Sequence, residues 1–328
     1  MFRRISALIA IGAIGMAMTG CGSDGDTGAS SAPGGGDKLV MGFSQVGAES
    51  GWRTANTKSV QESAAAAGIE LKFSDAQQKQ ENQIKAIRSY IQQKVDVIAF
   101  SPVVESGWDP VLNEAKRANI PVILTDRAVD SADTSLYKTF LGSDFVEEGR
   151  KAGQWLVEQY KDKTDPVTIV ELQGTTGSAP ANDRKAGFQE VIGSDPKFKI
   201  AASQTGDFTR AKGKEVMEAF LKSTPNIDVL FAHNDDMGLG AIEAIEGAGK
   251  VPGKDIVIIT IDAVKDGMQA LADGKINYIV ECSPLLGPQL MDLAQKVVKG
   301  EQVPARVVTE ETTFTQEQAK AVLAERKY

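Results

Sequence analysis

Histidine and cysteine are scarce in this chain of 328 residues, which has one histidine, His233, and two cysteines, Cys21 and Cys282. Nucleophilic catalysis by a Ser-His-Asp or Cys-His arrangement would have to depend on His233. Its place at the end of an apolar run favours a packed, hydrogen-bonded histidine instead. The adjacent acids in "HNDD" have no recognisable metal-ligand spacing, so we expect no metal site. Cys282 is expected to be a small buried side chain.

Basic charge is also in deficit, because the formal net charge is −8 and the pI is about 5.0. Nucleic acid is therefore excluded as a partner, since neutralising phosphates needs a basic face. The sequence has no GxxxxGK[ST] phosphate loop, and "GLGAIE" (238–243) lacks the third glycine of a dinucleotide-binding motif. We therefore expect no nucleotide cofactor.

The N-terminus has the pattern of an exported lipoprotein. Arg3 and Arg4 precede an apolar run from Ile5 to Met18 that is too short to span a bilayer comfortably. We predict a signal peptide over residues 1–20. The segment "MTGC" is similar to a bacterial lipobox, which implies a lipid anchor on Cys21 and leaves no pair for an internal disulfide. The alternative is an ordinary secretory signal with an incidental cysteine.

Residues 21–37 are rich in Gly, Ser and Asp and contain no large apolar side chain. Such a segment cannot form a core and is expected to be a flexible tether. A lipid anchor followed by a tether would hold a folded body just outside the cytoplasmic membrane.

From residue 38 onward, short apolar runs alternate with helical patterns, as in "ENQIKAIRSYIQQ", where Ile84, Ile87 and Ile91 share one helical face. This alternation predicts right-handed βαβ units and parallel sheets. The predicted strands form two series, at 39–43, 71–74, 95–101 and 121–125, and at 167–172, 199–204, 228–233 and 255–262.

Two such series predict an α/β fold with two doubly wound lobes. We assign residues 38–143 and 283–310 to the first lobe, and residues 144–282 and 311–328 to the second. The chain would then cross between the lobes in three segments, which is a hinge with a ligand cleft between two bodies.

Polar and aromatic residues follow the predicted strands. The carboxyl ends of strands in a doubly wound sheet open into the same crevice, so these side chains are expected to meet there. The candidate ligand-binding residues are Trp52, Arg53, Asp126, Arg127, Arg184, Phe208, Asn234 and Asp262.

This set suits a sugar, because carboxylates accept hydroxyl protons, guanidinium groups donate to neighbouring oxygens, and an aromatic face covers the C–H face of a sugar ring. Other interpretations stay open for single residues. Asp235, Asp236 or Asp262 could cap a helix. Asp126 and Arg127 could form a surface ion pair, Arg184 could be a solvated helix residue, and Trp52 could belong to the core.

Several long stretches carry a resemblance to a known family: "GFSQVGAESGWR", "QQKQENQIKAIRSYI", "ILTDRAVD", "QTGDFTRAKGKEVMEAF" and "AHNDDMGLGAIEAI". They resemble the type I periplasmic-binding-protein family of ribose and galactose ABC transporters, most of all its galactofuranose-binding subgroup. The resemblance covers nearly all of residues 39–328 and falls on the eight candidate residues above. A glutamine often found at the third crossover has no counterpart, and Glu281 and Cys282 occupy its neighbourhood.

This resemblance implies a monomeric binding protein, and not an enzyme, that captures a monosaccharide such as galactofuranose and delivers it to an ABC transporter permease. A sensor adaptor for a sugar or an autoinducer would use the same site. A secreted glycosidase with paired carboxylates is a further alternative. A LacI-type regulator shares the fold, but the signal peptide and the absence of a basic patch speak against it.

Overall fold

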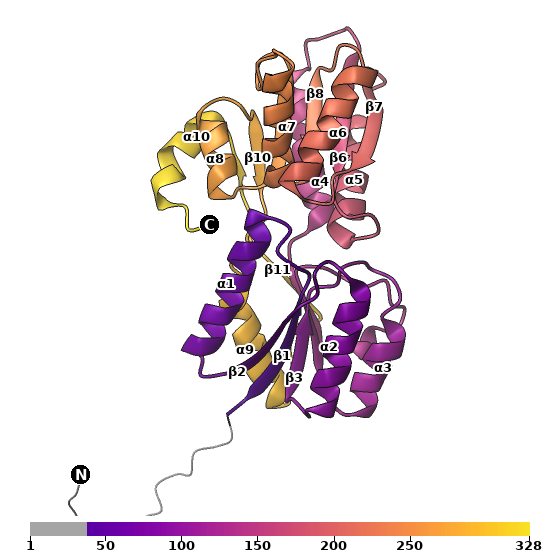
Figure 1. The fold of residues 1–328 in the computed structure, drawn as a ribbon, viewed down its shortest axis with the longest axis vertical. Helices are drawn as coiled ribbons and strands as arrows, with labels where there is room; N and C mark the ends of the chain where they lie inside the picture. Colours follow the sequence, from indigo (N-terminus) through magenta and orange to yellow (C-terminus); the bar gives the residue numbers. More distant parts are fainter. Residues whose placement is uncertain (1–37) are drawn as a thin grey trace, which may run out of the picture. The chain divides into compact units, whose positions relative to one another are not determined.

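The computed structural model describes residues 38–328, which cluster as one compact unit with two sheets of six strands each. The predicted signal peptide (1–20), the tether (21–37) and Cys21 lie outside the described residues. Each sheet has its own helices, and we call the two halves the first and the second lobe (Figure 1).

The first sheet is parallel throughout, in the order β11-β5-β4-β3-β1-β2. Its strands are β1 (Val40–Gln45), β2 (Glu70–Asp75), β3 (Val97–Phe100), β4 (Val122–Thr125), β5 (Thr139–Gly142) and β11 (Arg306–Val308).

Helices cover both faces of the first sheet. Helices α1 (Gly51–Ala66) and α9 (Gly287–Val298) share one core cluster with the sheet, and α2 (Gln80–Gln92) and α3 (Asp109–Arg117) share another. The apolar face predicted for α2 packs inward, with Ile87 fully buried and its neighbours partly so. A short 3-10 helix, η1 (Thr134–Leu136), precedes β5.

The second sheet has the order β12-β10-β9-β8-β6-β7, and only the edge strand β12 runs antiparallel to its neighbour. Its strands are β6 (Val167–Gln173), β7 (Phe198–Thr205), β8 (Val229–Ala232), β9 (Val257–Asp262), β10 (Tyr278–Glu281) and β12 (Thr313–Phe314).

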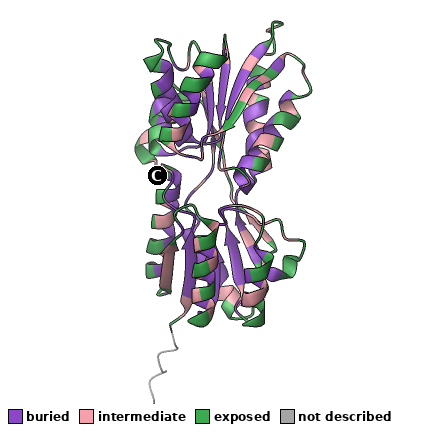
Figure 2. Cartoon of the chain, turned by 45° about the vertical axis from the view of Figure 1, so that its right-hand side comes forward, coloured by how far each residue is buried: buried purple, intermediate pink, exposed green. Residues whose placement is uncertain are grey.

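Two helices cover one face of the second sheet and four cover the other. The first face holds α4 (Phe145–Gln159) and α5 (Ala179–Ile192), and the second holds α6 (Arg210–Ser223), α7 (Asp235–Gly247), α8 (Lys265–Ala272) and α10 (Gln316–Val322). A 3-10 turn, η2 (Leu323–Glu325), follows α10. Figure 2 shows buried strands between helices whose outer faces are exposed.

The chain passes between the sheets three times, after β5, after β10 and after β11. The predicted class of two doubly wound lobes joined by a three-segment hinge is confirmed. The predicted series have four strands each, whereas each sheet has six, so β5, β10 and the edge strands β11 and β12 were not among the predicted strands. The extra edge strands β11 and β12 have three and two residues, too few to show an alternating pattern. Within residues 38–328, none of the helices combines the length and hydropathy needed to cross a bilayer.

Helices α4 and α5 pack backbone against backbone, and glycines permit this approach. A Cβ atom added at Gly149 would lie 2.2 Å from the carbonyl oxygen of Arg184, and one at Gly187 would lie 2.0 Å from that of Val146. The contact sets the position of α5, which carries Arg184.

We expect Gly149→Ala to lower the free energy of unfolding by about 1–3 kcal/mol, because the added methyl group forces the two helices apart. Gly247→Ala is the control, since a Cβ there meets no atom within 4 Å. It should leave stability unchanged or raise it by up to about 1 kcal/mol. Urea denaturation of both variants measures this, and equal stability would contradict the proposed crowding.

Candidate functional site

The structure brings all eight candidate residues together around one pocket between the lobes. Four come from the first lobe and four from the second, and the lining residues are Glu49, Ser50, Trp52, Arg53, Asp126, Arg127, Pro180, Arg184, Phe208, Asn234, Asp262 and Cys282. The unfilled space is about 290 Å³ with its open mouth included, but only about 20 Å³ admits the centre of a water molecule.

Trp52 and Arg53 lie in the first turn of α1, directly after the loop that follows β1. The hydroxyl of Ser50 caps this helix by accepting a hydrogen bond from the backbone N–H of Arg53 at 3.1 Å. The indole Nε1 of Trp52 donates to the carbonyl oxygen of Cys282 at 2.7 Å. Trp52 packs in the core cluster of the second lobe as well as lining the pocket. Its place in the core is thus confirmed, and its contact with a ligand stays a prediction.

Arg53 and Asp126 form a buried ion pair, with Nη2 of Arg53 2.6 Å from Oδ2 of Asp126. Oε1 of Glu49 accepts a further bond from Nε of Arg53 at 3.0 Å. Asp126 has a φ of 63°, a left-handed conformation that turns the chain sharply after β4. The alternative of a surface ion pair between Asp126 and Arg127 is wrong, because both side chains are buried.

Arg127 is the least satisfied cation of the pocket. Its Nη1 donates to the carbonyl oxygen of Val103 at 3.3 Å, but its Nε has no hydrogen-bond partner among the described residues. Burial and, to a smaller degree, the neighbouring charge of Arg53 lower the pKa of Arg127 to about 10, although Glu49 opposes the shift. Its guanidinium lies 5.2 Å from the ring centre of Phe208 in the other lobe.

Arg184 is buried on α5, which rules out a solvated helix residue. Its Nε donates to Oε2 of Glu148 at 2.7 Å, and its Nη1 donates to the carbonyl oxygen of His233 at 2.6 Å. Burial alone would lower the pKa of Arg184, but Glu148, Cys282 and Asp262 raise it overall. Arg184 is thus held as a fixed positive charge on the side of the pocket that the second lobe forms.

Asp262 ends β9 and faces Arg184, with 3.9 Å between its Oδ1 and Nη2 of Arg184. That distance is too long for a hydrogen bond. The side chain of Asp262 does not cap α8, because the cap residue is Val264. Burial raises the pKa of Asp262 well above its usual value, although Arg184 opposes the shift.

Asn234 is the cap residue of α7, and not Asp235 or Asp236 as the sequence left open. Its Oδ1 accepts from the backbone N–H of Met237 at 3.0 Å, and its Nδ2 donates to the carbonyl oxygen of Phe208 at 3.1 Å. Asn234 therefore lines the pocket and also fixes the loop that carries Phe208.

The ring of Phe208 needs a glycine opposite it. A Cβ atom added at Gly174, in the loop after β6, would lie 1.9 Å from Cζ of Phe208. The Gly-rich loop "QGTTGS" therefore makes room for an aromatic wall, and Phe208 itself has a φ of 60°.

Direct bonds hold the lobes together on both sides of the pocket. The backbone N–H of Gly51 donates to Oδ2 of Asp236 at 2.7 Å. On the other side the backbone N–H of Glu105 donates to the carbonyl oxygen of Gly177 at 2.9 Å, and Nδ2 of Asn182 lies 2.5 Å from Oε2 of Glu105. The structure is therefore that of a closed cleft.

The sequence analysis did not include four of the residues that line the pocket, namely Glu49, Ser50, Pro180 and Cys282. Glu49 lies in the loop after β1, so the rule that found Trp52 could also have found it. Its Oε2 is buried without a hydrogen-bond partner within residues 38–328. Glu281, beside Cys282, points elsewhere, since its Oε1 accepts from Arg326 and from Tyr328, both at 2.8 Å.

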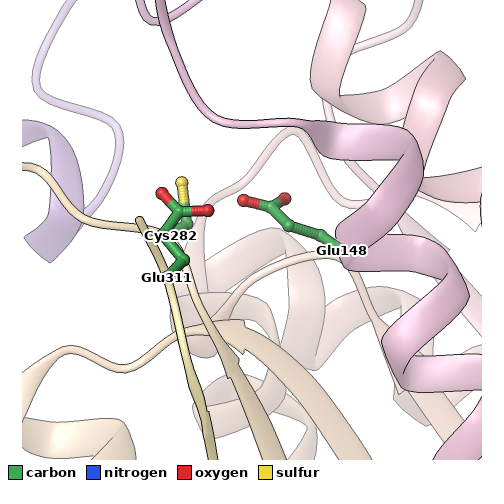
Figure 3. Close-up of side chains that lie close together, drawn as sticks. All are labelled: Glu148, Cys282 and Glu311. Atoms are coloured by element: carbon green, nitrogen blue, oxygen red, sulfur yellow. The ribbon is translucent and has the colours of Figure 1, made fainter. Parts of the chain in front are cut away.

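Within the part of the chain that the structure describes, one group has the composition of a metal site. It consists of Glu148, Cys282 and Glu311, whose donor atoms lie within 4.8 Å of one another (Figure 3). Arg184 already supplies a positive charge to Glu148, and a metal ion would be repelled by its guanidinium. We therefore assign no metal to this group.

The packed role expected for His233 is confirmed. The ring is fully buried, with 3.1 Å between its Nε2 and Oε1 of Glu171, and burial lowers the pKa of His233. Cys282 is buried too, as expected.

A family model described as "Periplasmic binding protein domain" matches residues 41–302. The chain belongs to the periplasmic binding protein family. It is 49% identical to the galactofuranose-binding protein YtfQ of Escherichia coli, over 88% of this chain and 92% of that protein. The resemblance seen in the sequence is thus confirmed, and family membership implies an extracytoplasmic binding protein rather than an enzyme.

Two solved structures are similar over 88% of this chain. One, from Mycobacterium smegmatis in complex with β-D-fucofuranose, is 69% identical, with a TM-score of 0.87 and 95% of its own chain covered. The other is the periplasmic binding protein component of the arabinose ABC transporter from Shewanella sp. ANA-3, bound to α- and β-L-arabinofuranose. It is 52% identical, with a TM-score of 0.85 and 96% of its chain covered.

Replacing Asp126 by Asn should lower the free energy of unfolding by about 3 kcal/mol, because Arg53 and Arg127 then lose a buried counter-charge. Asn keeps the shape of Asp126 and tolerates its left-handed backbone. Glu114→Gln breaks an exposed ion pair with Arg88 and should leave stability nearly unchanged. Denaturant titration compares the two variants, and a similar small effect of both would show that the buried pair adds little.

Proposed function

We propose that this protein captures a monosaccharide in its furanose form between its lobes and delivers it to the permease of an ABC transporter. The observation that supports this most is the composition of the pocket. Two aromatic side chains and several guanidinium and carboxylate groups, drawn from both lobes, line one small space. Galactofuranose or a related aldose is the proposed cargo, because several of the most similar proteins bind furanoses by name or title.

The proposed roles follow from the contacts. Trp52 and Phe208 present rings to the C–H faces of the sugar. Nε of Arg127 is a buried donor without a partner, and Oε2 of Glu49 is a buried acceptor without one in the described chain. A sugar hydroxyl can donate to one group and accept from the other, which would remove the cost of burying both unpaired.

Asp262 and Arg184 offer a second position for a hydroxyl group. The 3.9 Å between their nearest atoms is too long for a direct bond. A hydroxyl oxygen placed beside them could accept from Arg184 and donate to Asp262. The bound sugar would then connect the two lobes and stabilise the closed cleft through contacts that the open one lacks.

Delivery requires that the protein stay near the membrane. We propose that acylated Cys21 anchors a monomer there and that the closed lobes present their shared surface to the permease. Cys21 and the tether lie outside the described residues, and the sequence motif is what supports this part.

The sugar proposal is tested by calorimetric titration of the soluble Cys21→Ser protein with galactose, fucose, arabinose, ribose and fructose. Binding should raise thermal stability by mass action. Carbon NMR of the bound sugar should show the furanose ring. If none of these sugars binds, the proposal is wrong. If a sugar binds as a pyranose, the proposed furanose form is wrong.

Arg127→Met should weaken binding of the best sugar about tenfold to a hundredfold, the effect of losing charged hydrogen bonds worth roughly 1.5–3 kcal/mol. Met keeps the apolar stem of the side chain but removes its donors. Arg150→Met is the control, because Arg150 pairs with Glu190 on the outer surface of α4. If both variants bind as the wild type does, Arg127 does not contact the sugar.

For the anchor, Cys21→Ser should move the protein from the membrane fraction to the soluble fraction of the expressing cell. Cys282→Ser should remain in the membrane fraction, because Cys282 is buried in the hinge. Fractionation followed by immunoblotting measures both. Membrane retention of the Cys21→Ser protein would contradict the lipid anchor.

A further inference from the structure

The three segments that cross between the lobes meet in one hydrogen-bonded cluster. Ser143 comes from the first crossing, Cys282 from the second and Glu311 from the third. The hydroxyl of Ser143 bonds to the carboxylate of Glu311 and lies 3.3 Å from Sγ of Cys282. Oε1 of Glu311 also accepts from the backbone N–H of Ser283 at 3.0 Å and from Thr309 at 2.8 Å.

Glu148 faces this cluster from the first turns of α4 (Figure 3). One carboxyl oxygen, Oε2, accepts from Nε of Arg184 at 2.7 Å. The other, Oε1, is buried and has no hydrogen-bond partner in the described part of the chain. Its carboxyl group points at Cys282 and Glu311, and the donor atoms of the three residues lie within 4.8 Å of one another.

We propose that Glu148 is a positioning residue, which holds Arg184 toward the pocket with one oxygen and carries a proton on the other, beside the hinge cluster, when the cleft is closed. The inference rests on the proposed function, because Arg184 is a proposed sugar contact. It adds a link between the sugar-facing wall and the segments about which the lobes move.

A proton is the species that fits the geometry. The buried carboxylate of Glu148 is repelled by the half-buried carboxylate of Glu311 this close to it, unless one of the two is protonated. The charged and titratable groups around Glu148 are Arg184 on α5, Asp262 at the end of β9, and Cys282 and Glu311 in the hinge. On its own helix Lys151 lies near, but its Nζ donates to the carbonyl oxygen of Glu311.

The pKa of Glu148 agrees with this arrangement. Burial and, to a smaller degree, the charge of Glu311 raise the pKa of Glu148 to about 8, although Arg184 opposes the shift. At neutral pH the carboxyl group therefore keeps its proton in the closed structure.

This protonation predicts the pH dependence of binding. When the cleft opens, Glu148 stays against Arg184 of its own lobe, but water reaches it from the hinge side. Its pKa then falls part of the way toward 4.5, and closure takes up a proton. Sugar affinity should fall as the pH rises toward 8 and level off above it, when Glu148 is ionised in both forms. A difference of about one pKa unit between the two forms corresponds to a tenfold change in affinity.

The test compares sugar dissociation constants from pH 5 to pH 9 for wild type, Glu148→Gln, Glu148→Ala and the control Glu147→Gln. Gln resembles the protonated acid, since it accepts from Arg184 and carries no charge, so the sugar affinity of this variant should be high and independent of pH. Ala should weaken binding about tenfold or more at every pH. Glu147 is half-exposed on the same turn, where it pairs with Arg150, and its variant should follow the wild type.

Thermal unfolding without sugar gives a second measurement that does not depend on the proposed function. A raised folded-state pKa makes stability fall with rising pH between about 4.5 and 8. The wild type should therefore lose stability relative to Glu148→Gln across this range. The inference is overturned if the wild type and Glu148→Gln have parallel unfolding profiles. It is also overturned if the Gln and Ala variants bind the sugar with the dissociation constants of the wild type at every pH. Failure of every protein to bind sugar, with unfolding profiles that diverge as expected, would overturn only the proposed function.

Discussion

Pairing of buried guanidinium and carboxylate groups is the constraint on which the pocket depends. Arg53 lies 2.6 Å from Asp126 and Arg184 lies 2.7 Å from Glu148, and all four side chains are buried. A buried guanidinium group without partners is costly, so each arginine requires its acid, as an ionised carboxylate for Asp126 and as a hydrogen-bond acceptor for Glu148. The same pairs hold the polar groups of the pocket in fixed orientations before a ligand arrives, which lowers the entropy cost of binding.

This pairing also explains why so much charge can gather where two lobes close. The charged groups follow strand ends or lie near the starts of α1, α5 and α7, which meet at the pocket. The hydrogen bond between Gly51 and Asp236 joins the two lobes beside them. Groups that remain unpaired, such as Nε of Arg127, are positions where a ligand can replace missing partners. The same set of side chains therefore serves the stability of the protein and the binding of a ligand. Some of their polar groups pair within the protein, and others are free to bond to a hydroxyl group of the ligand.

Much of the fold and of the pocket could be predicted because both follow local rules. Apolar runs alternating with helical patterns indicate βαβ units, and the residue after a parallel strand faces the crevice, which located Asp126, Arg127 and Asp262. Glu148 escaped this reasoning because it lies inside a helix, away from a strand end. Its importance comes from α5, whose Arg184 lies against it only because Gly149 and Gly187 let the two helices approach closely.

The sequence by itself determined the fold class, because periodic patterns indicate strands and helices, and it determined the family through the resemblance of several long stretches. It also supplied eight of the twelve residues that line the pocket, because most of these follow strand ends. Only the tertiary structure decided which charges pair, that Asn234 rather than Asp235 caps its helix, and that Ser143, Cys282 and Glu311 meet at the hinge. These three residues are more than a hundred positions apart at the widest, and side-chain pairing over such separations depends on how the sheets and helices pack. Local sequence patterns carry no record of that packing.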